Sequence, residues 1–152
     1  MTGSLKDQTV LVIGRGSGLA RAIALAAQDA GAQVIAAGRD SGALAAAYAG
    51  EPGISTETVD LTDETSIAAL GERLGTLDHV VSTASARARG RVPDLDRDAI
   101  RLSFDTKVIG PLMLAKHLAP RMNTSGSFVI FALTSTFLTG QTLHIDGGEP
   151  LT

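Results

Sequence analysis

Residues 10–26 read VLVIGRGSGLARAIALA, with three glycines in five residues between an apolar run and an alanine-rich stretch. The apolar run predicts a strand that ends at Ile13, and the alanine-rich stretch predicts a helix that begins near Ser17 or Gly18. Amides at the N-terminus of such a helix attract an anion, and glycine in the turn lets a phosphate group approach the backbone. Because the glycines follow a strand and precede a helix near the start of the chain, dinucleotide binding is favoured over a purely structural turn.

The rest of the chain alternates short apolar runs with longer stretches of helical periodicity. The short runs predict strands over residues 9–13, 33–37, 55–59, 79–82, 127–131 and 142–145. Helices are predicted over residues 19–30, 43–49, 65–74 and about 98–118. Nearly continuous apolar strands that are linked by helices indicate a parallel sheet covered on both faces. The predicted fold is therefore α/β, a doubly wound parallel sheet, in a single domain over residues 1–152.

Composition and charge exclude several classes of function. The 152 residues are 44% hydrophobic and contain 13 Lys and Arg against 16 Asp and Glu, without a basic run, which argues against nucleic acid as the main partner. The absence of cysteine excludes disulfides and zinc–thiolate sites, and His79, His117 and His144 lack metal-ligand spacing, so no metal site is predicted. No leader and no apolar run of about 18 residues is present, so we expect no membrane partner and a cytoplasmic location.

The spacing of the glycine turn points to one family. Three residues after Gly16 comes Leu19, so the common G-x-G-x-x-G fingerprint fails, whereas G-x-x-x-G-x-A fits Gly14, Gly18 and Ala20. This pattern resembles the T-G-x-x-x-G-x-G turn of the short-chain dehydrogenase/reductase family. Segments similar to that family follow in its order along nearly the whole chain: residues 60–62, 77–81, 104–110, 126–130 and 137–148.

The resemblance implies a Rossmann-like fold and an oxidoreductase that transfers a hydride between a nicotinamide dinucleotide and a carbonyl or alcohol substrate. It also implies the residues that would contact the cofactor, which are Gly14, Arg15, Gly16, Ser17, Gly18, Leu19, Arg39, Asp60, Leu61, Thr83 and Ala84.

The end of the second strand indicates which dinucleotide is bound. A carboxylate there selects NAD because it accepts the ribose hydroxyls, whereas an Arg accommodates the 2′-phosphate of NADP. Here Gly38 ends the strand and Arg39 follows, with Arg15 of the glycine turn as a second candidate partner of the phosphate. The alternatives are a solvated Arg39 or one neutralised by Asp40. The sequence favours NADP.

The family's catalytic residues are largely missing. The family uses a Ser, a Tyr four residues before a Lys, and an Asn on the central helix, but the only tyrosine is Tyr48, and Pro52 stands four positions after it. Lys107 stands where the Asn is expected and is a candidate catalytic acid, the alternative being a lysine that extends into solvent. Residues 82–85 replace the family's Asn-Asn-Ala-Gly, and residues 134–136 could occupy the place of its Ser.

The chain resembles a family member with an internal deletion, which would account for the missing pair. Only nine residues, 132–140, separate Phe131 from Gln141, where the family has the Tyr-Lys helix, another strand and the substrate loop. The sheet is therefore expected to be truncated after its fifth strand. Catalysis by this chain is then in question, and the alternatives are a non-catalytic nucleotide-binding or interaction module and a part of a longer active enzyme. An uncovered apolar sheet face would also drive self-association into a homo-oligomer.

Overall fold

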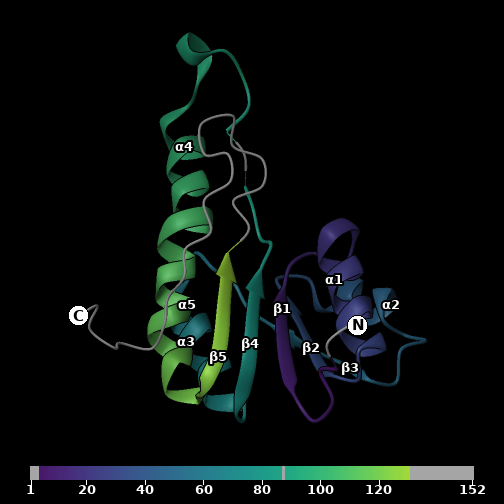
Figure 1. Cartoon of the computed structure of the whole chain (residues 1–152). Helices are drawn as coiled ribbons and strands as arrows, with labels where there is room; N and C mark the ends of the chain where they lie inside the picture. Colours follow the sequence, from purple (N-terminus) through teal and green to yellow (C-terminus); the bar gives the residue numbers. More distant parts are fainter. Residues whose placement is uncertain (1–3, 87, 131–152) are drawn as a thin grey trace.

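The computed structural model describes residues 4–86 and 88–130, and within them five parallel strands form one sheet. The strands are β1 (Thr9–Ile13), β2 (Gln33–Gly38), β3 (Ile54–Thr58), β4 (Leu77–Ser82) and β5 (Met122–Ile130). Their order across the sheet is β3-β2-β1-β4-β5, so the chain moves outward from β1 to β3 and then crosses back to β4 (Figure 1). This reversal beside β1 is the topological switch point of a doubly wound fold.

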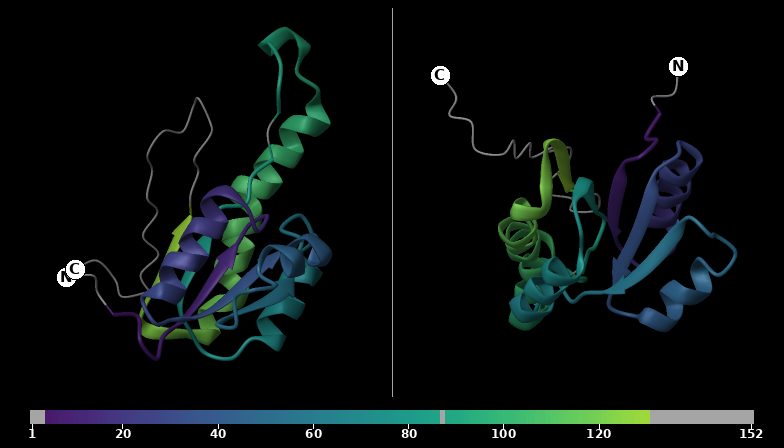
Figure 2. Two further views of the ribbon diagram at one scale, coloured as in Figure 1. Left: turned by 90° about the vertical axis from the view of Figure 1, so that its right-hand side faces the viewer. Right: turned by 90° about the horizontal axis from the view of Figure 1, so that it is seen from below.

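Helices cover both faces of the sheet (Figure 2). The regular helices are α1 (Gly18–Asp29), α2 (Ser41–Ala47), α3 (Glu64–Arg73), α4 (Arg97–Phe104) and α5 (Gly110–Leu118). Two short 3₁₀ turns, η1 (Val92–Asp94) and η3 (Ala119–Arg121), flank the last two helices, and a π-helical turn, η2 (Asp105–Ile109), joins α4 to α5. Together α4, η2 and α5 form one continuous helical rod. As Figure 1 shows, this rod extends beyond the ends of the strands.

The alternation of side chains along β1 separates two apolar layers. Val10 and Val12 pack with the small side chains of α1, including Ala24, which is fully buried. Leu11 points the other way, into a larger layer that contains Leu114 of α5. Successive strand residues face opposite sides of a sheet, so the central strand must be apolar on both faces. This burial explains why the run TVLVI contains no charged residue.

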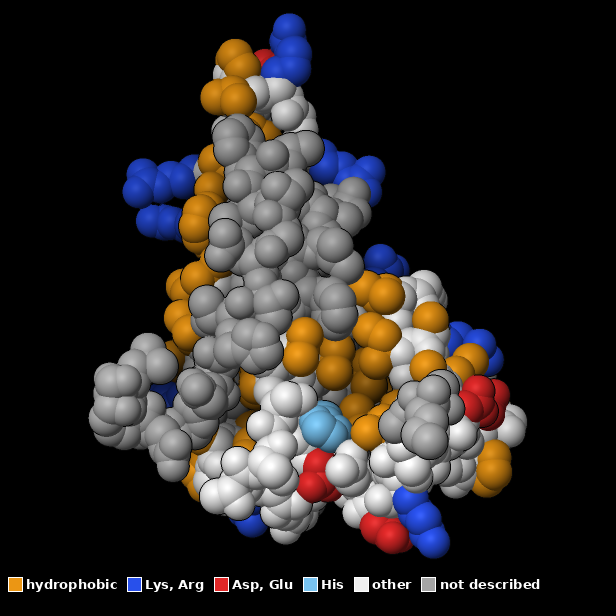
Figure 3. Space-filling view, viewed as in Figure 1, with side chains coloured by type: hydrophobic (Ala, Val, Ile, Leu, Met, Phe, Trp, Pro, Cys, Tyr) orange, Lys and Arg blue, Asp and Glu red, His pale blue; other side chains and the backbone are white. Residues whose placement is uncertain are grey.

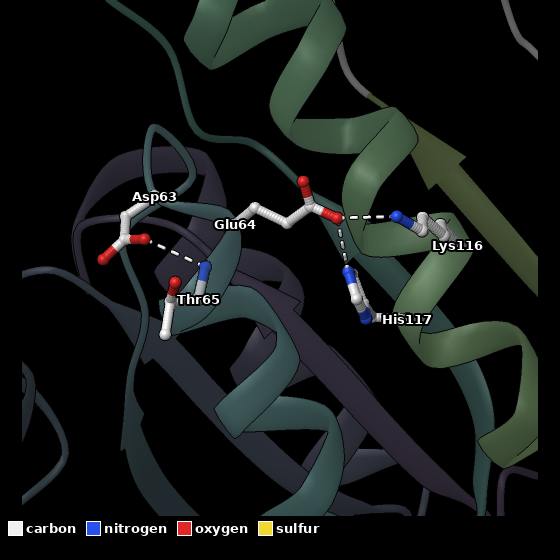
Figure 4. Close-up of polar contacts among 5 residues, drawn as sticks. All are labelled: Asp63, Glu64, Thr65, Lys116 and His117. Carbon is white, nitrogen blue, oxygen red and sulfur yellow. Dashed lines mark hydrogen bonds and ion pairs between the residues drawn. The ribbon is translucent and has the colours of Figure 1, made fainter.

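A polar contact joins α3 to α5 above the larger apolar layer (Figure 4). Glu64 Oε1 accepts hydrogen bonds from Lys116 Nζ at 2.7 Å and from His117 Nε2 at 2.9 Å. Asp63, the preceding residue, accepts from the backbone N–H of Thr65 and caps the start of α3. The carboxylates at the start of α3 therefore fix both its first turn and its position against α5.

The structure confirms the predicted order of strands and helices within the described residues, with shifts of a few residues at the ends. The predicted continuous helix over about 98–118 was wrong in one respect, because the π-turn interrupts it between Phe104 and Gly110. A π-turn holds one residue more than an α-turn, and hydrophobic periodicity does not reveal such an insertion. The predicted strand over 142–145 and the segments 134–136 and 137–148 lie outside the described residues.

The expected uncovered apolar sheet face stays a prediction, and the described residues show which groups lie on β4 and β5. On the α1 side of β4 and β5 the register aligns His79 with Ser127 and Val81 with Val129, and all four are half-buried. His79 Nδ1 lies 2.7 Å from Ser127 Oγ, and its Nε2 lies 3.0 Å from Gln8 Oε1, so polar contacts occupy part of this face. Within the described residues, most exposed large apolar side chains lie instead on the helical rod (Figure 3).

Candidate functional site

A cavity of about 1110 Å³ opens at the carboxyl ends of the parallel strands. Ligands of open α/β sheets bind in this position, at the switch point beside β1. The lining combines small, polar and basic side chains from the loops after several strands and from α2. These residues are Ile13, Gly14, Arg15, Gly16, Ser17, Gly38, Arg39, Asp40, Ser41, Ala43, Ala46, Ala47, Val59, Asp60, Leu61, Thr62, Ala84, Ser85 and Thr106.

The glycine turn is closely packed against its surroundings at two positions. A Cβ atom added to Gly14 would lie 2.5 Å from both Ala20 Cβ and Thr83 Oγ1. One added to Gly38, at the end of β2, would collide with the carbonyl oxygen of Gly14. Glycine at these sites brings the ends of β1 and β2 and the start of α1 together, which shapes the floor of the cavity.

Two other glycines of the turn have backbones in the left-handed region. Gly16 has φ +70° and Gly18 has φ +56°, where residues with a side chain are strained. A Cβ on Gly16 would lie 3.1 Å from side-chain atoms of Leu44 and Ala47, whereas a Cβ on Gly18 would have no neighbour within 4 Å. Gly18 is therefore required by its backbone conformation rather than by space within the described structure.

The N-terminus of α1 differs from those of the helices that begin with aspartate. The side chains of Asp40, Asp63 and Asp96 accept hydrogen bonds from the backbone of α2, α3 and α4, respectively. Ser17 at the start of α1 makes no such side-chain bond within the described part of the chain. The first amides of a helix need partners, so this end, which opens on the cavity, is suited to an anionic group.

Basic side chains lie on the same cavity. Arg15 comes from the glycine turn and Arg39 from the loop after β2, and both are exposed. Asp40 directs its Oδ1 to the backbone N–H of Ala43 at 2.9 Å, so its carboxylate caps α2. The alternative that Asp40 neutralises Arg39 is therefore not favoured, because that carboxylate already accepts a bond from its own helix.

Asp60, in the loop after β3, lines the same cavity. Its Oδ1 accepts hydrogen bonds from the backbone N–H of Thr62 at 2.9 Å and from the Thr62 hydroxyl at 2.7 Å. The bond from the Thr62 backbone, followed by the Thr62 hydroxyl and the charge of Arg39, holds the pKa of Asp60 below its ordinary value, against the effect of burial. Asp60 is therefore a fixed anion that orders the loop after β3.

The cavity is also lined by Ala84 and Ser85 of the loop after β4 and by Thr106 of η2. Thr83 donates its hydroxyl to the carbonyl oxygen of Ile13 at 3.0 Å, and its backbone N–H donates to the same oxygen at 2.8 Å. Thr83 thus joins the loop after β4 to the glycine turn. Thr83 is not itself a lining residue, so it affects the shape of the cavity only through these two hydrogen bonds.

The structure brings most of the predicted cofactor residues to this cavity. The predicted residues in the lining are Gly14, Arg15, Gly16, Ser17, Arg39, Asp60, Leu61 and Ala84. Gly18, Leu19 and Thr83 adjoin the lining without belonging to it. The sequence reasoning missed Ser41 and Thr106. The start of α2, directly after Arg39, was a signal for Ser41, whereas the π-turn that places Thr106 left no signal.

The two titratable residues considered for catalysis lie in different surroundings. Lys107 is half-buried in η2 next to Thr106 but is not among the described residues that line the cavity. Tyr48 is buried at the end of α2, near Gly16, and burial raises the pKa of its hydroxyl. That hydroxyl has no hydrogen-bond partner within the described residues. Tyr48 packs beneath the glycine turn, as expected of a structural residue.

The arrangement fits an elongated ligand with a negatively charged centre. The uncapped start of α1 suits a diphosphate, the arginines suit a further phosphate, and the buried side chains of Val59 and Leu61 provide an apolar wall.

Within the described residues, no helix is both long enough and apolar enough to cross a lipid bilayer.

Comparison with known proteins identifies close relatives of this architecture. Residues 13–136 match the family described as enoyl-(acyl carrier protein) reductase. The chain is 34% identical over 131 residues to 2-keto-3-deoxy-L-fuconate dehydrogenase of Xanthomonas campestris pv. campestris, covering 86% of this chain and 44% of that protein. It is 28% identical over 123 residues to L-xylulose reductase of Mesocricetus auratus, covering 81% of this chain and 50% of the reductase.

Solved structures have the same fold. A short-chain type dehydrogenase/reductase from Mycobacterium ulcerans superposes with a TM-score of 0.75 at 34% identity, over 83% of this chain and 51% of that one. A short-chain dehydrogenase of Escherichia coli CFT073, solved with NADPH, superposes with a TM-score of 0.76 at 22% identity, over 84% and 59%. The chain thus spans about half the length of the proteins that it matches.

Proposed function

The chain belongs to the short-chain dehydrogenase/reductase family, and we propose that its cavity binds the nicotinamide dinucleotide of that family in the phosphorylated form, NADP(H). The family implies a nicotinamide cofactor, and the glycine turn, the uncapped start of α1 and the size of the cavity support one here. When bound, this cofactor carries a hydride to or from a substrate.

The preference for NADP(H) rests on the loop after β2. Arg39 and Arg15 lie on one cavity, Gly38 provides no carboxylate at the end of β2, and the Asp40 carboxylate caps α2. A guanidinium forms a charge-assisted pair with a phosphate, whereas a ribose hydroxyl needs an acceptor that Arg cannot supply. We assign Arg39 to the 2′-phosphate, with Arg15 as its second partner.

Titration of the two cofactors tests this assignment. The chain should bind NADPH more tightly than NADH, and Arg39→Ala should weaken NADPH by roughly 10- to 100-fold, because a hydrogen bond to a charged group contributes about 1.5–3 kcal/mol. Binding of NADH should change little. Arg121→Ala, on the exposed η3 turn and outside the cavity lining, is the matched control. Equal affinities for the two cofactors, or an unchanged ratio in Arg39→Ala, would contradict the assignment.

The proposed reaction is reduction of a small carbonyl compound or oxidation of the corresponding alcohol. Of the described residues, Lys107 is the candidate acid, since it follows Thr106, a lining residue of the cavity, in η2. NADPH oxidation with a panel of ketones and aldehydes tests the activity. Lys107→Met should then abolish turnover while NADPH still binds, and full activity in this variant would remove Lys107 from the mechanism.

One observation favours a second candidate, a non-catalytic dinucleotide-binding module. The sequence contains one tyrosine, and Tyr48 is buried with a raised pKa, so it is not placed to exchange a proton with a substrate. Absence of turnover with every carbonyl compound, together with retained NADPH binding, would support the module.

We further propose that the protein acts in the cytoplasm and that it self-associates, as the exposed apolar surface of the helical rod favours.

A further inference from the structure

Away from the cavity, a serine and a histidine are in direct contact on the α1 side of the sheet. His79 of β4 and Ser127 of β5 are neighbours in the register, and His79 Nδ1 lies 2.7 Å from Ser127 Oγ. The second ring nitrogen of His79, Nε2, lies 3.0 Å from Oε1 of Gln8. His79 and Ser127 are half-buried, so part of each remains open to solvent. Neither is among the described residues that line the cavity.

The two contacts of the imidazole decide where its proton lies. A side-chain amide oxygen only accepts hydrogen bonds, so the contact with Gln8 Oε1 requires a proton on Nε2 of His79. In the neutral ring Nδ1 then carries a lone pair and accepts the hydroxyl proton of Ser127. A serine that donates to a histidine, whose other nitrogen is held by a third group, has the arrangement of an activated nucleophile.

The backbone holds these three groups in place. His79 and Ser127 lie on paired parallel strands. The backbone N–H of Gln8 donates to the carbonyl oxygen of Leu5 at 3.0 Å, and its carbonyl oxygen accepts from the N–H of Gln33 at 2.9 Å. Sites built on sheet strands are positioned more precisely than sites on loops. The contact between His79 and Ser127 is therefore formed before any substrate binds.

The surface beside this pair indicates which compounds it suits. Val81 and Val129 are paired in the register two residues further along the same face, and both are half-buried. Figure 3 shows hydrophobic side chains beside a histidine on the face of the molecule that it presents. Such a surface favours an uncharged, apolar acyl group, because a charged group would lose its hydration there without a partner.

We propose that Ser127 is a nucleophile, activated by His79 and with Gln8 as a positioning residue, that hydrolyses small apolar esters. Ser127 Oγ forms a bond to the carbonyl carbon of the ester, and its proton passes to Nδ1 of His79. The bond to the alcohol then breaks, and the departing alcohol takes the proton from Nδ1. Water attacks the acyl-serine in the same way and releases the acid. Ester and water thus become acid and alcohol, so this activity does not depend on dinucleotide binding.

Labelling with a fluorophosphonate tests the nucleophile in the natural chain. Ser127 Oγ should displace fluoride from phosphorus, and peptide mass spectrometry should find the adduct on Ser127. His79→Gln should slow labelling by roughly 100-fold or more, because general-base catalysis contributes about 10²–10⁴-fold. Ser125→Ala, at an exposed position of β5, is the matched control and should keep the natural rate. No adduct on Ser127, or unchanged labelling in His79→Gln, would overturn the proposal.

Hydrolysis of p-nitrophenyl butyrate tests turnover. The natural chain should release a burst of nitrophenol as the acyl-serine forms, and Ser127→Ala should lose both the burst and the steady rate. Circular dichroism checks that this variant is folded. Hydrolysis that persists in Ser127→Ala but disappears in His79→Gln would mean that the imidazole attacks the ester itself, and Ser127 would not be the nucleophile.

Two substitutions at Gln8 test its positioning role. Gln8→Leu should lower kcat by about 10-fold or more with little change in KM, because the imidazole loses the bond that sets its proton position. Gln8→Glu, which also accepts from Nε2, should retain activity. Equal rates in the two variants would remove this role. NADPH titration of Ser127→Ala keeps the hypotheses apart, since unchanged binding leaves the cofactor assignment intact whatever the result with esters.

Discussion

The half of the sheet that contains β1, β2 and β3 differs from the half that contains β4 and β5 in the residues at its strand ends. In the first half, Gly14, Arg39 and Asp60 follow successive strands and line one cavity. In the second half, Ser85 lines the same cavity, whereas Lys107 in the helical rod after β4 is not among its lining residues. Under the proposed function, the residues that would anchor a dinucleotide lie mainly in the first half and the candidate acid lies in the second, which teaches that binding and chemistry can be carried by separate parts of one fold.

The largest expected effect is on cofactor binding by the half that contains β1, β2 and β3. Gly18→Val should weaken NADPH and NADH together by at least 100-fold, because a β-branched residue cannot readily hold φ +56° and the turn that presents the α1 amides would change. The loss of stability should be smaller, about 1–2 kcal/mol, as for a residue with a side chain in the left-handed region. Calorimetric titration and urea unfolding measure the two effects.

Gly50→Val is the control for this comparison, since a Cβ on Gly50 would also have no neighbour within 4 Å and its φ is not positive. This variant should bind both cofactors as the natural chain does. Normal binding by Gly18→Val would mean that the glycine turn is only structural, and the distinction between the two halves would lose its basis.

An intermediate effect is expected where the two halves join. Asp78 of β4 accepts from the backbone N–H of Thr9 at 2.8 Å on β1 and from the side chain of Asn123 on β5. The bond from Thr9, then that from Asn123, lowers the pKa of the Asp78 carboxyl. Asp78→Asn should reduce the free energy of unfolding at neutral pH by about 1 kcal/mol, because a hydrogen-bonded charge near the surface is replaced by an amide.

The effect of Asp78→Asn on the free energy of unfolding should depend on pH in one direction. A carboxyl whose folded pKa is lowered stabilises the protein fully above its unfolded pKa, near 3.8, and loses that contribution as the pH falls through the folded value. The difference between the natural chain and Asp78→Asn should therefore be constant near neutrality and shrink below about pH 4. Asp29→Asn, on the exposed surface of α1, should show no such difference. A gap that widens in acid would be inconsistent with this role of Asp78.

The smallest effect is expected at the contact between α3 and α5. The hydrogen bond from Lys116, followed by the bond from His117, lowers the pKa of Glu64 (Figure 4). Because Glu64 is exposed, Glu64→Gln should lower the melting temperature less than Asp78→Asn does, and added salt should reduce the difference. The contribution of Glu64 should be complete above its ordinary pKa and disappear as the pH falls through the lowered value.

Glu72→Gln on the same helix is the matched control, since Glu72 is also exposed. Its melting temperature should follow that of the natural chain at every salt concentration. If Glu64→Gln instead destabilised the protein more than Asp78→Asn, the contact between α3 and α5 would matter more than the junction of β1, β4 and β5.

The features of the half that contains β1, β2 and β3 could be predicted from the sequence because the signals for them are local. The glycines that follow Ile13, the apolar run of β1 and the alanine periodicity of α1 each lie within a few residues of one another, and steric limits on the backbone act over that range. Residues such as Arg39 and Asp60 could be placed at the cavity because they directly follow strands, and parallel strands end at one edge of the sheet.

Other features depended on contacts between distant or competing groups. Whether Asp40 would pair with Arg39 or cap α2 could not be decided from adjacent letters, since both partners lie within reach. Likewise, Leu112 and Leu114 are the same residue type and lie two positions apart in α5, but Leu114 is buried and Leu112 is exposed.

The sequence by itself thus determined the order of strands and helices and the position of the glycine turn, both of which are set by residue identity and short-range sterics. Only the tertiary structure decided the π-turn before Gly110, the exposure of Phe104 and Leu112 and the position of Thr106 on the cavity. The close approach of Gly110 to the carbonyl oxygen of Leu61 shows why. Helix position depends on packing against a segment far away in the chain, which local periodicity does not encode.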